Sequence, residues 1–239
     1  GNGSNLLVSD SGIRGVVLHL SKEYSHIRVE GNTLVCEAGA TLAAIAKKAC
    51  ASALSGFEFA AGIPGSLGGA IVMNAGAYGG EMREVIKYVK LMTPEGKIIQ
   101  KNTDEMHFGY RHSLLKEQPL IVLEAAIALV PGELANIQSR MEELAAKRRE
   151  KQPLEYPSAG STFKRPEGYF ASKLIEDAGL RGAFVGGAQV SEKHCGFVVN
   201  KNQASSSDVY ALIQEIQKKV RESSGVNIEP EVIFIGSFG

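Results

Sequence analysis

The sequence has few cysteines and none of the spacings that bind structural metals. Its three cysteines, Cys36, Cys50 and Cys195, form no C-x-x-C pair. An odd number without such a spacing argues against a disulfide framework and against a zinc ribbon. The five histidines are scattered and include no H-x-x-x-H pair. We therefore expect no metal site, and a reducing cytoplasm as the compartment.

Long apolar runs and an excess of one charge are also absent. No run reaches the roughly 20 apolar residues that a membrane-spanning helix needs. Lys plus Arg number 26 and Asp plus Glu number 26, so the formal net charge is +0. This balance gives no basis for binding nucleic acid or an acidic membrane surface. We expect a monomer that binds small molecules, with neither nucleic acid nor membrane as a partner.

The chain does not begin with methionine. Gly1 opens the sequence GNGSN, and apolar residues follow at positions 6–8. Asn, Ser and Gly favour tight turns and side-chain-to-backbone hydrogen bonds, so residues 1–5 alone predict a plain hairpin turn. Because the start falls in the middle of a motif, we expect an N-terminally incomplete piece.

One stretch is far richer in glycine than the rest. Residues 62–81, here called the glycine-rich segment, read GIPGSLGGAIVMNAGAYGGE, with seven glycines and no charge before Glu81. So much glycine excludes one continuous helix or strand, and the apolar residues exclude a solvated linker. Two interpretations stay open. The segment is either a tight buried turn between core strands or backbone that closely approaches an anionic ligand.

Hydrophobic periodicity and turn residues give a coarse secondary structure. The expected strands cover residues 15–20, 27–30, 33–37, 85–93, 97–101, 120–129, 184–190, 196–200 and 231–235. The expected helices cover residues 41–51, 133–150, 170–178 and 205–223. Gly31-Asn32 and Pro94-Glu95-Gly96 predict hairpin turns. Pro131 and Gly132 mark a boundary between a strand-rich first part and a smaller part with two long helices, so the fold class is α+β.

Six motifs, in a fixed order, now carry a family resemblance. They are GNGSNLLV at 1–8, the glycine-rich segment, FGYRHS at 108–113, PSAGSTFKRP at 157–166, GGAQVSEKHCGFVVN at 186–200 and EPEV at 229–232. In this order they resemble the UDP-N-acetylenolpyruvoylglucosamine reductases, also called UDP-N-acetylmuramate dehydrogenases. The resemblance covers nearly the whole chain. The short distance from Arg111 to Ser161 is similar to the compact subtype of that family.

The resemblance implies a domain organisation. An FAD-binding domain of the vanillyl-alcohol-oxidase-like type would precede a smaller α+β substrate domain. Residues 1–20 would be the remnant of a first FAD-binding subdomain, joined by residues 226–239. Residues 21–130 would form the second FAD-binding subdomain, and residues 131–225 the substrate-binding domain.

The resemblance also implies a reaction. NADPH would reduce UDP-N-acetylglucosamine enolpyruvate to UDP-N-acetylmuramate, with FAD carrying the hydride, in peptidoglycan precursor synthesis. The protein must then supply a flavin site, charge stabilisation for an enolate and one proton donor. The implied FAD-binding residues are Gly1, Asn2, Gly3, Ser4, Asn5, Gly62, Pro64, Gly65, Ser66, Gly68, Gly69, Asn74, Ala75 and Gly76.

The implied catalytic residues are Arg111, Ser161 and Glu231. Arg111 would hold the substrate carboxylate, because a guanidinium makes paired hydrogen bonds and stays charged. Ser161 would protonate C2, which suits a weak acid only because a carbanion is strongly basic. Glu231 would act with Arg111 on the enolate, if burial raises its pKa. Strand alternation leaves Glu229 as a neighbouring candidate.

The remaining assignments concern the substrate and the alternatives. Tyr110, Lys151, Arg165 and His194 are implied as substrate-binding residues. Arg165 replaces an asparagine common in the longer subtype, and Ile233 stands where the family often has a basic residue. Outside the resemblance, Asn74 can be a satisfied core residue, and the charged side of helix 133–150, including Arg148, is expected to be solvated. Two other functions stay open: a different FAD-dependent oxidase, and a non-catalytic fragment that binds a nucleotide sugar.

Overall fold

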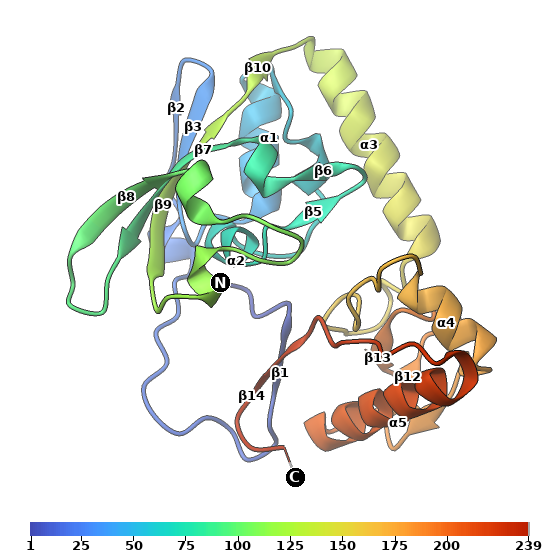
Figure 1. The fold of residues 1–239 in the computed structure, drawn as a ribbon. Coiled ribbons are helices and arrows are strands. Elements are labelled where there is room, and N and C mark those ends of the chain that lie inside the picture. The colour runs from blue at the N-terminus through green and yellow to red at the C-terminus, as the bar shows by residue number, and fades with distance from the viewer. Residues whose placement is uncertain (239) are drawn as a thin grey trace. The chain divides into compact units, whose positions relative to one another are not determined.

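A computed structural model describes residues 1–238 and divides the chain into two compact units (Figure 1). Unit 1 comprises Gly1–Asn2 and Leu18–Arg148. Unit 2 comprises Gly3–Val17 and Arg149–Gly239, of which Gly239 lies outside the described residues. Gly239 is also the last residue of the predicted segment 226–239, so that segment is described only up to residue 238.

Unit 1 is built on a five-stranded antiparallel sheet with the strand order β2-β3-β9-β7-β8. Its strands are β2 (Ile27–Glu30), β3 (Thr33–Glu37), β7 (Ile86–Met92), β8 (Ile98–Asn102) and β9 (Ile121–Ala128). The predicted hairpin at Gly31-Asn32 joins β2 to β3, and Gly31 has a φ of 59°, which glycine adopts without strain.

Two helices of unit 1 pack against this sheet and close its core (Figure 1). They are α1 (Leu42–Ala51) and α2 (Leu67–Val72). Thr41 caps α1 by accepting a hydrogen bond from the N–H of Ala44 at 3.2 Å. The apolar residues of α1 recur at helical spacing and are buried, as the sequence predicts.

Short elements complete unit 1. The strands are β4 (Leu54–Ser55) with β10 (Val130–Pro131), and β5 (Gly76–Ala77) with β6 (Gly80–Glu81). The 3₁₀ helices are η1 (Lys22–Tyr24), η2 (Glu58–Ala60), η3 (Met82–Glu84), η4 (Asp104–Met106) and η5 (Leu114–Lys116).

Helix α3 (Leu134–Lys151) crosses from unit 1 into unit 2. The boundary between the units falls at residues 148 and 149, whereas the sequence places a boundary at residues 131 and 132. The reason is that α3 turns its apolar side toward unit 1, where Met141 packs against the core cluster. The division into three domains stays a prediction.

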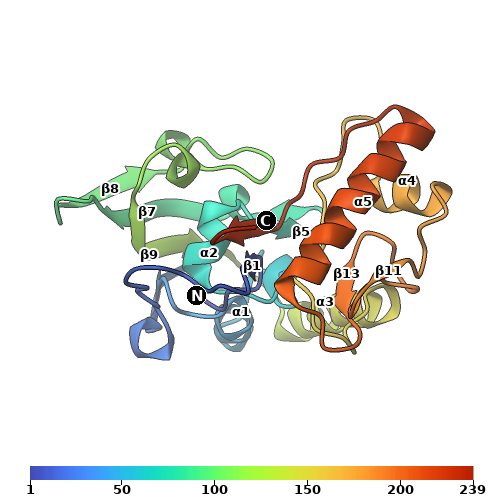
Figure 2. The same ribbon diagram turned by 90° about the horizontal axis from the view of Figure 1, so that it is seen from below.

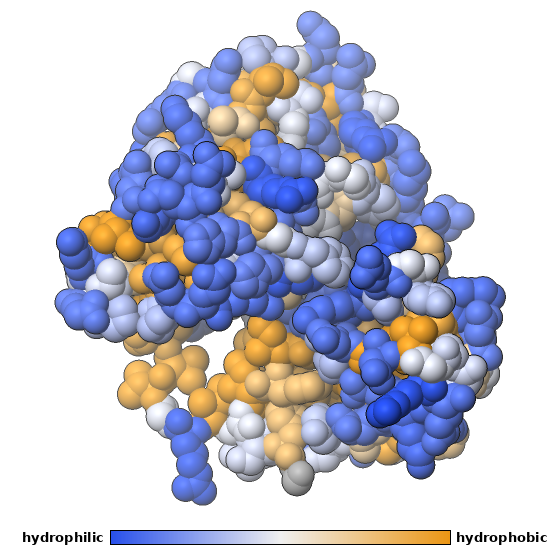
Figure 3. Space-filling view, in the orientation of Figure 1, coloured by the Kyte–Doolittle hydropathy of each residue, from blue (hydrophilic) through white to orange (hydrophobic). Residues whose placement is uncertain are grey.

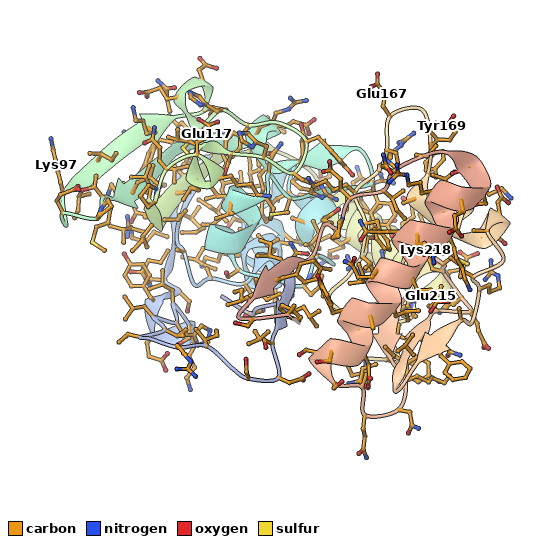
Figure 4. The ribbon with its side chains drawn as sticks, turned by 60° about the horizontal axis from the view of Figure 1, so that its bottom comes forward. Lys97, Glu117, Glu167, Tyr169, Glu215 and Lys218 are labelled. Atoms are coloured by element: carbon orange, nitrogen blue, oxygen red, sulfur yellow. The ribbon has the colours of Figure 1, made fainter. Side chains whose placement is uncertain are left out.

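Unit 2 has a separate core. Its elements are β1 (Leu6–Val8), α4 (Ala171–Asp177), β11 (Phe184–Val185), β12 (Ala188–Val190), β13 (Val198–Asn200), α5 (Ser206–Ser224) and β14 (Ile233–Ile235). Helices α4 and α5 lie beside the antiparallel sheet β11-β12-β13 (Figure 2). Four apolar residues of α5 are buried, while Glu215 and Lys218 belong to its outer side (Figure 4).

Strands β1 and β14 form a parallel pair that joins the two ends of the chain, with Leu6 opposite Ile233. Asp10 follows β1 and accepts hydrogen bonds from the N–H groups of Ser206 and Ser207 at 2.8 and 2.9 Å. Residues 3–17 therefore belong to unit 2 because they pair with β14 and cap α5.

The predicted strand at residues 15–20 is wrong. Val16 and Val17 are 90% and 63% exposed, and no described strand pairs with them. Figure 3 shows hydrophobic residues gathered over the region of β1 and β14. An apolar run forms a strand only where a neighbouring strand pairs with it.

Several other predicted strands are shorter in the structure, among them 196–200, which is reduced to β13. The run 184–190 is divided into β11 and β12, because Gly186-Gly187 forms a two-residue hairpin turn in which Gly186 has a φ of 52°. The last strand begins at Ile233 rather than Glu231. Glu231 thus lies in the segment before β14, where strand alternation does not apply.

Candidate functional site

Part of the glycine-rich segment is closely packed backbone, the first of the two structures that its sequence left open. Gly68 donates its N–H to the carbonyl of Ala38 at 2.9 Å, and a Cβ at Gly68 would lie 3.2 Å from Ala38 Cβ. A Cβ at Gly76 would lie 2.6 Å from the carbonyl oxygen of Gly80. These glycines are required because backbone segments of unit 1 pack closely against one another.

Ser66 and Gly69 form the open part of the same segment. Ser66 is 3% exposed, and a Cβ at Gly1 would collide with its hydroxyl. A Cβ at Gly69 would meet nothing closer than Ser66 Oγ at 3.8 Å. Unit 1 therefore brings the predicted FAD-binding residues Gly1 and Ser66 together and leaves one side of Gly69 accessible. Backbone of this kind fits the close approach of a phosphate.

Arg148 is a candidate site residue that the sequence interpretation missed. A Cβ at Gly62 would lie 3.2 Å from Arg148 Cδ, so the arginine stem lies over the start of the glycine-rich segment. Burial lowers the pKa of Arg148, and Tyr78 raises it to a smaller extent. Within residues 1–238, Arg148 makes no ion pair. A half-buried cation without a counter-ion is costly, which makes it a good partner for an anion.

A sequence signal for Arg148 did exist. Met141, Leu144 and Arg148 recur at i, i+3 and i+7, so one face of α3 carries all three. Leu144 is buried and Met141 packs against the core of unit 1. The prediction of a fully solvated charged side for α3 is therefore wrong at Arg148, because the helix turns that residue toward unit 1.

Asn74 is completely buried and its side chain is satisfied by the protein. Its Nδ2 donates to the carbonyl of Gly109 at 3.0 Å, and its Oδ1 accepts from the N–H of Arg83 at 2.9 Å. Of the two interpretations of this side chain, the structure shows the satisfied core residue. Asn74 also has a φ of 42°, in the left-handed region that Asn tolerates better than most residues.

Arg111 lies at the tip of a two-residue turn, residues 109–112, here called the Arg111 turn. Gly109 and His112 exchange both backbone hydrogen bonds, at 3.1 and 3.2 Å. Arg111 has a φ of 53° and its guanidinium lies 5.1 Å from the ring centroid of Tyr110. Tyr110, predicted to bind substrate, is 54% exposed, and Arg111, predicted to be catalytic, is half-buried beside it.

Two histidines flank the Arg111 turn and share one carboxylate. Glu117, labelled in Figure 4, lies 2.8 Å from His112 Nε2 and 3.0 Å from His107 Nδ1. The hydrogen bond from His112, followed by that from His107, lowers the pKa of Glu117. All three side chains are substantially exposed, so this cluster holds the outer side of the turn only weakly.

Unit 2 joins the backbone of Glu231 to Asn5 and to Thr162, the residue after Ser161, although these positions are far apart in the sequence. Glu231 donates its N–H to the carbonyl of Thr162 at 2.8 Å. Asn5 Nδ2 donates to the carbonyl of Glu231 at 3.2 Å. Ser161 precedes Thr162, is exposed, and has a hydroxyl that makes no hydrogen bond with any of residues 1–238. Its hydroxyl is available to a ligand.

Glu229 and Glu231 have different surroundings. Glu229 forms a 2.8 Å ion pair with Lys164, its side chain is 73% exposed, and this pairing lowers its pKa. Glu231 is half-buried. A carboxyl that is to donate a hydrogen bond must stay protonated, and the environment of Glu229 opposes protonation. This environment argues against Glu229 as the protonated carboxyl, and the role of Glu231 stays a prediction.

The other predicted substrate-binding residues are spread over unit 2. Lys151 ends α3 and is exposed. The Arg165 guanidinium lies 4.1 Å from the ring centroid of Phe170. His194 accepts a hydrogen bond at Nδ1 from the N–H of Gly196, and burial lowers its pKa. The neutral His194 ring therefore carries its proton on Nε2 and can donate it to a ligand.

Unit 2 also contains a cavity of about 360 Å³. It is lined by residues of β1, β13, α5 and the loop around Ser158, and by Gly3 among the predicted FAD-binding residues. Ser161 and Glu231 do not line it. Residues 1–238 contain no group of three or more His, Cys, Asp or Glu side chains suited to a metal ion. No helix in the described part of the chain has the length and apolarity to span a membrane.

Two family models match the chain. An FAD binding domain matches residues 1–101, and the C-terminal domain of UDP-N-acetylenolpyruvoylglucosamine reductase matches residues 152–235. A reductase of that name from Agathobacter rectalis is 55% identical over all of this chain and 80% of its own length. The one from Caldanaerobacter subterraneus is 55% identical over 99% of this chain and 78% of its own. The chain belongs to the UDP-N-acetylenolpyruvoylglucosamine reductase family.

A solved structure of the family agrees in fold. The crystal structure of UDP-N-acetylenolpyruvylglucosamine reductase from Thermus caldophilus superposes with a TM-score of 0.88 at 36% identity, over 99% of this chain and 84% of that one. The predicted family, the α+β class, the FAD cofactor and the class of FAD-dependent oxidoreductase are confirmed. Membership of the reductase family excludes the alternative function of a different FAD-dependent oxidase. The roles of individual residues stay predictions.

Proposed function

We propose that this chain catalyses the NADPH-dependent reduction of UDP-N-acetylglucosamine enolpyruvate to UDP-N-acetylmuramate in peptidoglycan precursor synthesis. The observation that carries the proposal is the pairing of Glu231 with Thr162, beside Ser161, within a family member. A general acid and an enolate-stabilising carboxyl are two of the groups that this reduction requires.

The cofactor residues fit FAD. Ser66, Gly69 and Gly1 provide small residues and open backbone, and Arg148 provides an unpaired cation beside Gly62. These residues would hold FAD, whose diphosphate is anionic. When bound, FAD supplies hydride transfer from NADPH to C3 of the enolpyruvyl group. The chain itself binds and orients the cofactor and handles the charge and the proton of the substrate.

Arg111 binds the substrate carboxylate in this proposal. A guanidinium stays charged and donates two parallel hydrogen bonds to a carboxylate, which fixes the plane of the enolpyruvyl group. Negative charge moves onto that carboxylate as C2 becomes carbanionic, so the interaction strengthens toward the transition state. The tight turn that displays Arg111 supports this role.

Ser161 donates the proton to C2, and Glu231 assists at the enolate. The exposed hydroxyl of Ser161 has no hydrogen-bond partner among residues 1–238, so its proton is not committed elsewhere. Glu231, kept protonated, donates a hydrogen bond to the developing enolate oxygen. Lys151, Arg165 and His194 would contact the nucleotide sugar, where two cations and one neutral N–H donor suit diphosphate and carbonyl oxygens.

The test uses purified protein in two steps. Bound FAD is measured first from the yellow absorbance, and then NADPH oxidation is followed with the enolpyruvyl substrate. In the Ser161→Ala variant, flavin reduction by NADPH should persist while substrate reduction falls by about 10² or more. Ser158→Ala, in the same loop, is the matched control and should retain activity.

Two outcomes contradict the proposal. A colourless protein that takes up no added FAD supports the alternative of a non-catalytic nucleotide-sugar binder. Loss of both half-reactions in Ser161→Ala removes the proton-donor role.

The monomeric state stays a prediction, which light scattering after size exclusion can measure. A cytoplasmic location also stays a prediction, and the three buried free cysteines are consistent with it.

A further inference from the structure

We propose that Asn74 and Ser113 are positioning residues that hold the Arg111 turn in its substrate-binding geometry. Asn74 belongs to the glycine-rich segment, and Ser113 directly follows the turn. Both residues are 0% exposed, and both use their side chains to join the turn to the end of α2. The inference rests on the proposed role of Arg111 in binding the substrate carboxylate.

The Arg111 turn cannot hold its own geometry cheaply. Arg111 has a φ of 53°, in the left-handed region, which is unfavourable for a residue other than glycine. Only two residues separate the hydrogen-bonded pair Gly109 and His112. A short isolated hairpin of this kind is at best marginally stable in water. Its conformation must therefore come from contacts with the rest of unit 1.

Asn74 anchors the start of the turn. Its Nδ2 donates to the carbonyl of Gly109 at 3.0 Å, two residues before Arg111. Its Oδ1 is held at the same time by the N–H of Arg83 at 2.9 Å. Since both ends of the amide are engaged and no part of the residue is exposed, the side chain has one orientation. The carbonyl of Gly109 is thereby fixed in direction.

Ser113 anchors the end of the turn. Its Oγ donates to the carbonyl of Val72 at 2.8 Å, two residues after Arg111. Val72 is the last residue of α2, where carbonyls have no partner inside the helix. The two anchors thus lie at symmetrical positions around Arg111, and both reach residues 72–74. One segment of backbone sets where the arginine points.

The glycine-rich segment consequently has a second task. Its backbone around Ser66 and Gly69 fits the cofactor, while its far end positions a side chain that acts on the substrate. Misplacement of a binding group by about 1 Å can cost about 10² in rate. Loosening either anchor should therefore affect the substrate half-reaction and leave the reduction of flavin by NADPH unchanged.

The experiment compares Ser113→Ala, Ser113→Thr and Asn74→Gly with Thr103→Ala. Glycine accepts the left-handed backbone of Asn74, so this variant removes the side chain alone. Thr103 donates to the carbonyl of Ile86 in the same unit, away from the turn, and matches the loss of one side-chain hydrogen bond. Stopped-flow absorbance measures flavin reduction by NADPH and flavin reoxidation by the substrate separately.

We expect Ser113→Ala and Asn74→Gly to slow reoxidation by about tenfold or more, with flavin reduction within twofold of wild type. Ser113→Thr should recover most of the loss, because threonine keeps the hydroxyl. In the Arg111→Ala background, Ser113→Ala should add less than about twofold, since residues that act through one another are not additive. Independent, multiplicative losses would overturn the inference, as would an equal loss in Thr103→Ala.

A second readout needs no turnover. Hydrogen exchange of the N–H groups of Gly109 and His112 should accelerate in Ser113→Ala and stay unchanged in Thr103→Ala. If the wild-type protein proves inactive, the proposed function fails, and exchange still tests the anchoring. If exchange is unchanged in both Ser113→Ala and Asn74→Gly, the anchoring is refuted even where activity is present. If Asn74→Gly does not fold, the two Ser113 variants carry the comparison.

Discussion

The N–H of Glu231 donates a hydrogen bond of 2.8 Å to the carbonyl oxygen of Thr162. This bond joins residues 69 positions apart and places the backbone of Glu231 beside Thr162, the residue that follows Ser161. Phe163 and Pro230 form a bridge on the adjoining position, and Lys164 pairs with Glu229 on the next. Two segments of unit 2 therefore run side by side. Their pairing fixes the position of Glu231 along the segment that contains Ser161.

Glu231→Gln should reduce substrate turnover strongly. We expect a loss of about 10² to 10³ in kcat, the range typical of removing one group that stabilises developing oxyanion charge. Glu229→Gln is the matched control and should retain activity, because Glu229 is exposed and paired with Lys164. Steady-state assays of both variants measure the difference, and equal losses would contradict the choice of Glu231.

Arg148→Met should weaken FAD binding. Hydrogen bonds to charged groups contribute about 1.5–3 kcal/mol, so the dissociation constant should rise roughly tenfold to a hundredfold. Methionine keeps much of the apolar stem that lies over Gly62. Arg149→Met, an exposed neighbour, is the control. Fluorescence titration of the apoprotein with FAD gives both constants, and equal affinities would exclude Arg148 from the cofactor site.

Asp10 should make the stability of unit 2 sensitive to acid. Hydrogen bonds from the Ser207 hydroxyl and from the N–H groups of Ser206 and Ser207 depress the pKa of Asp10 far below its ordinary value. A depressed folded-state pKa contributes stability above the unfolded pKa of about 3.9, and this stability is lost as the pH falls below it.

The comparison uses Asp10→Asn and urea unfolding between pH 7 and pH 3. The free energy of unfolding of the wild type should exceed that of the variant at pH 7, and this difference should become smaller as the pH falls. Asp177→Asn, which removes a surface pair with Lys173, should change little at either pH. A gap that is constant with pH would contradict the linkage.

The three free cysteines should be inert in the folded protein. Cys36, Cys50 and Cys195 are all buried, and burial raises the pKa of Cys36 to about 12. Since the thiolate is the reactive form, a disulfide reagent at pH 8 should react slowly with the native protein. In urea the same reagent should label all three thiols. Rapid labelling of a native thiol, located by mass spectrometry, would show that the core of its unit opens.

Local chemistry made part of the fold predictable. The hairpin β2-β3 was predicted with its observed bounds, because Gly31-Asn32 separates two runs rich in β-formers. Helix α5 was predicted within one residue at each end, because Ser205 and Asp208 form a capping box and Gly225 adopts the left-handed conformation that ends a helix.

Tertiary contacts decided what the sequence could not. Residues 16 and 17 have strand composition but no strand beside them. The order of six motifs identified the family, FAD and the set of candidate residues. It gave no information on the partners of Asn74, which depend on where residues 83 and 109 arrive. The burial of Arg148 also depends on which way α3 faces its unit, although the helical spacing carried a hint.

The parallel pairing of β1 with β14 has a consequence for how the protein is made. Leu6 and Ile233 lie 227 positions apart in the sequence, and they must meet for the pair to form. Closing so long a loop is entropically unfavourable and delays folding. Unit 1 can form its sheet while translation continues, since β9 ends at Ala128. Unit 2 cannot complete this pair until β14 has left the ribosome, and until then β1 is an unpaired strand that is open to chaperones or aggregation.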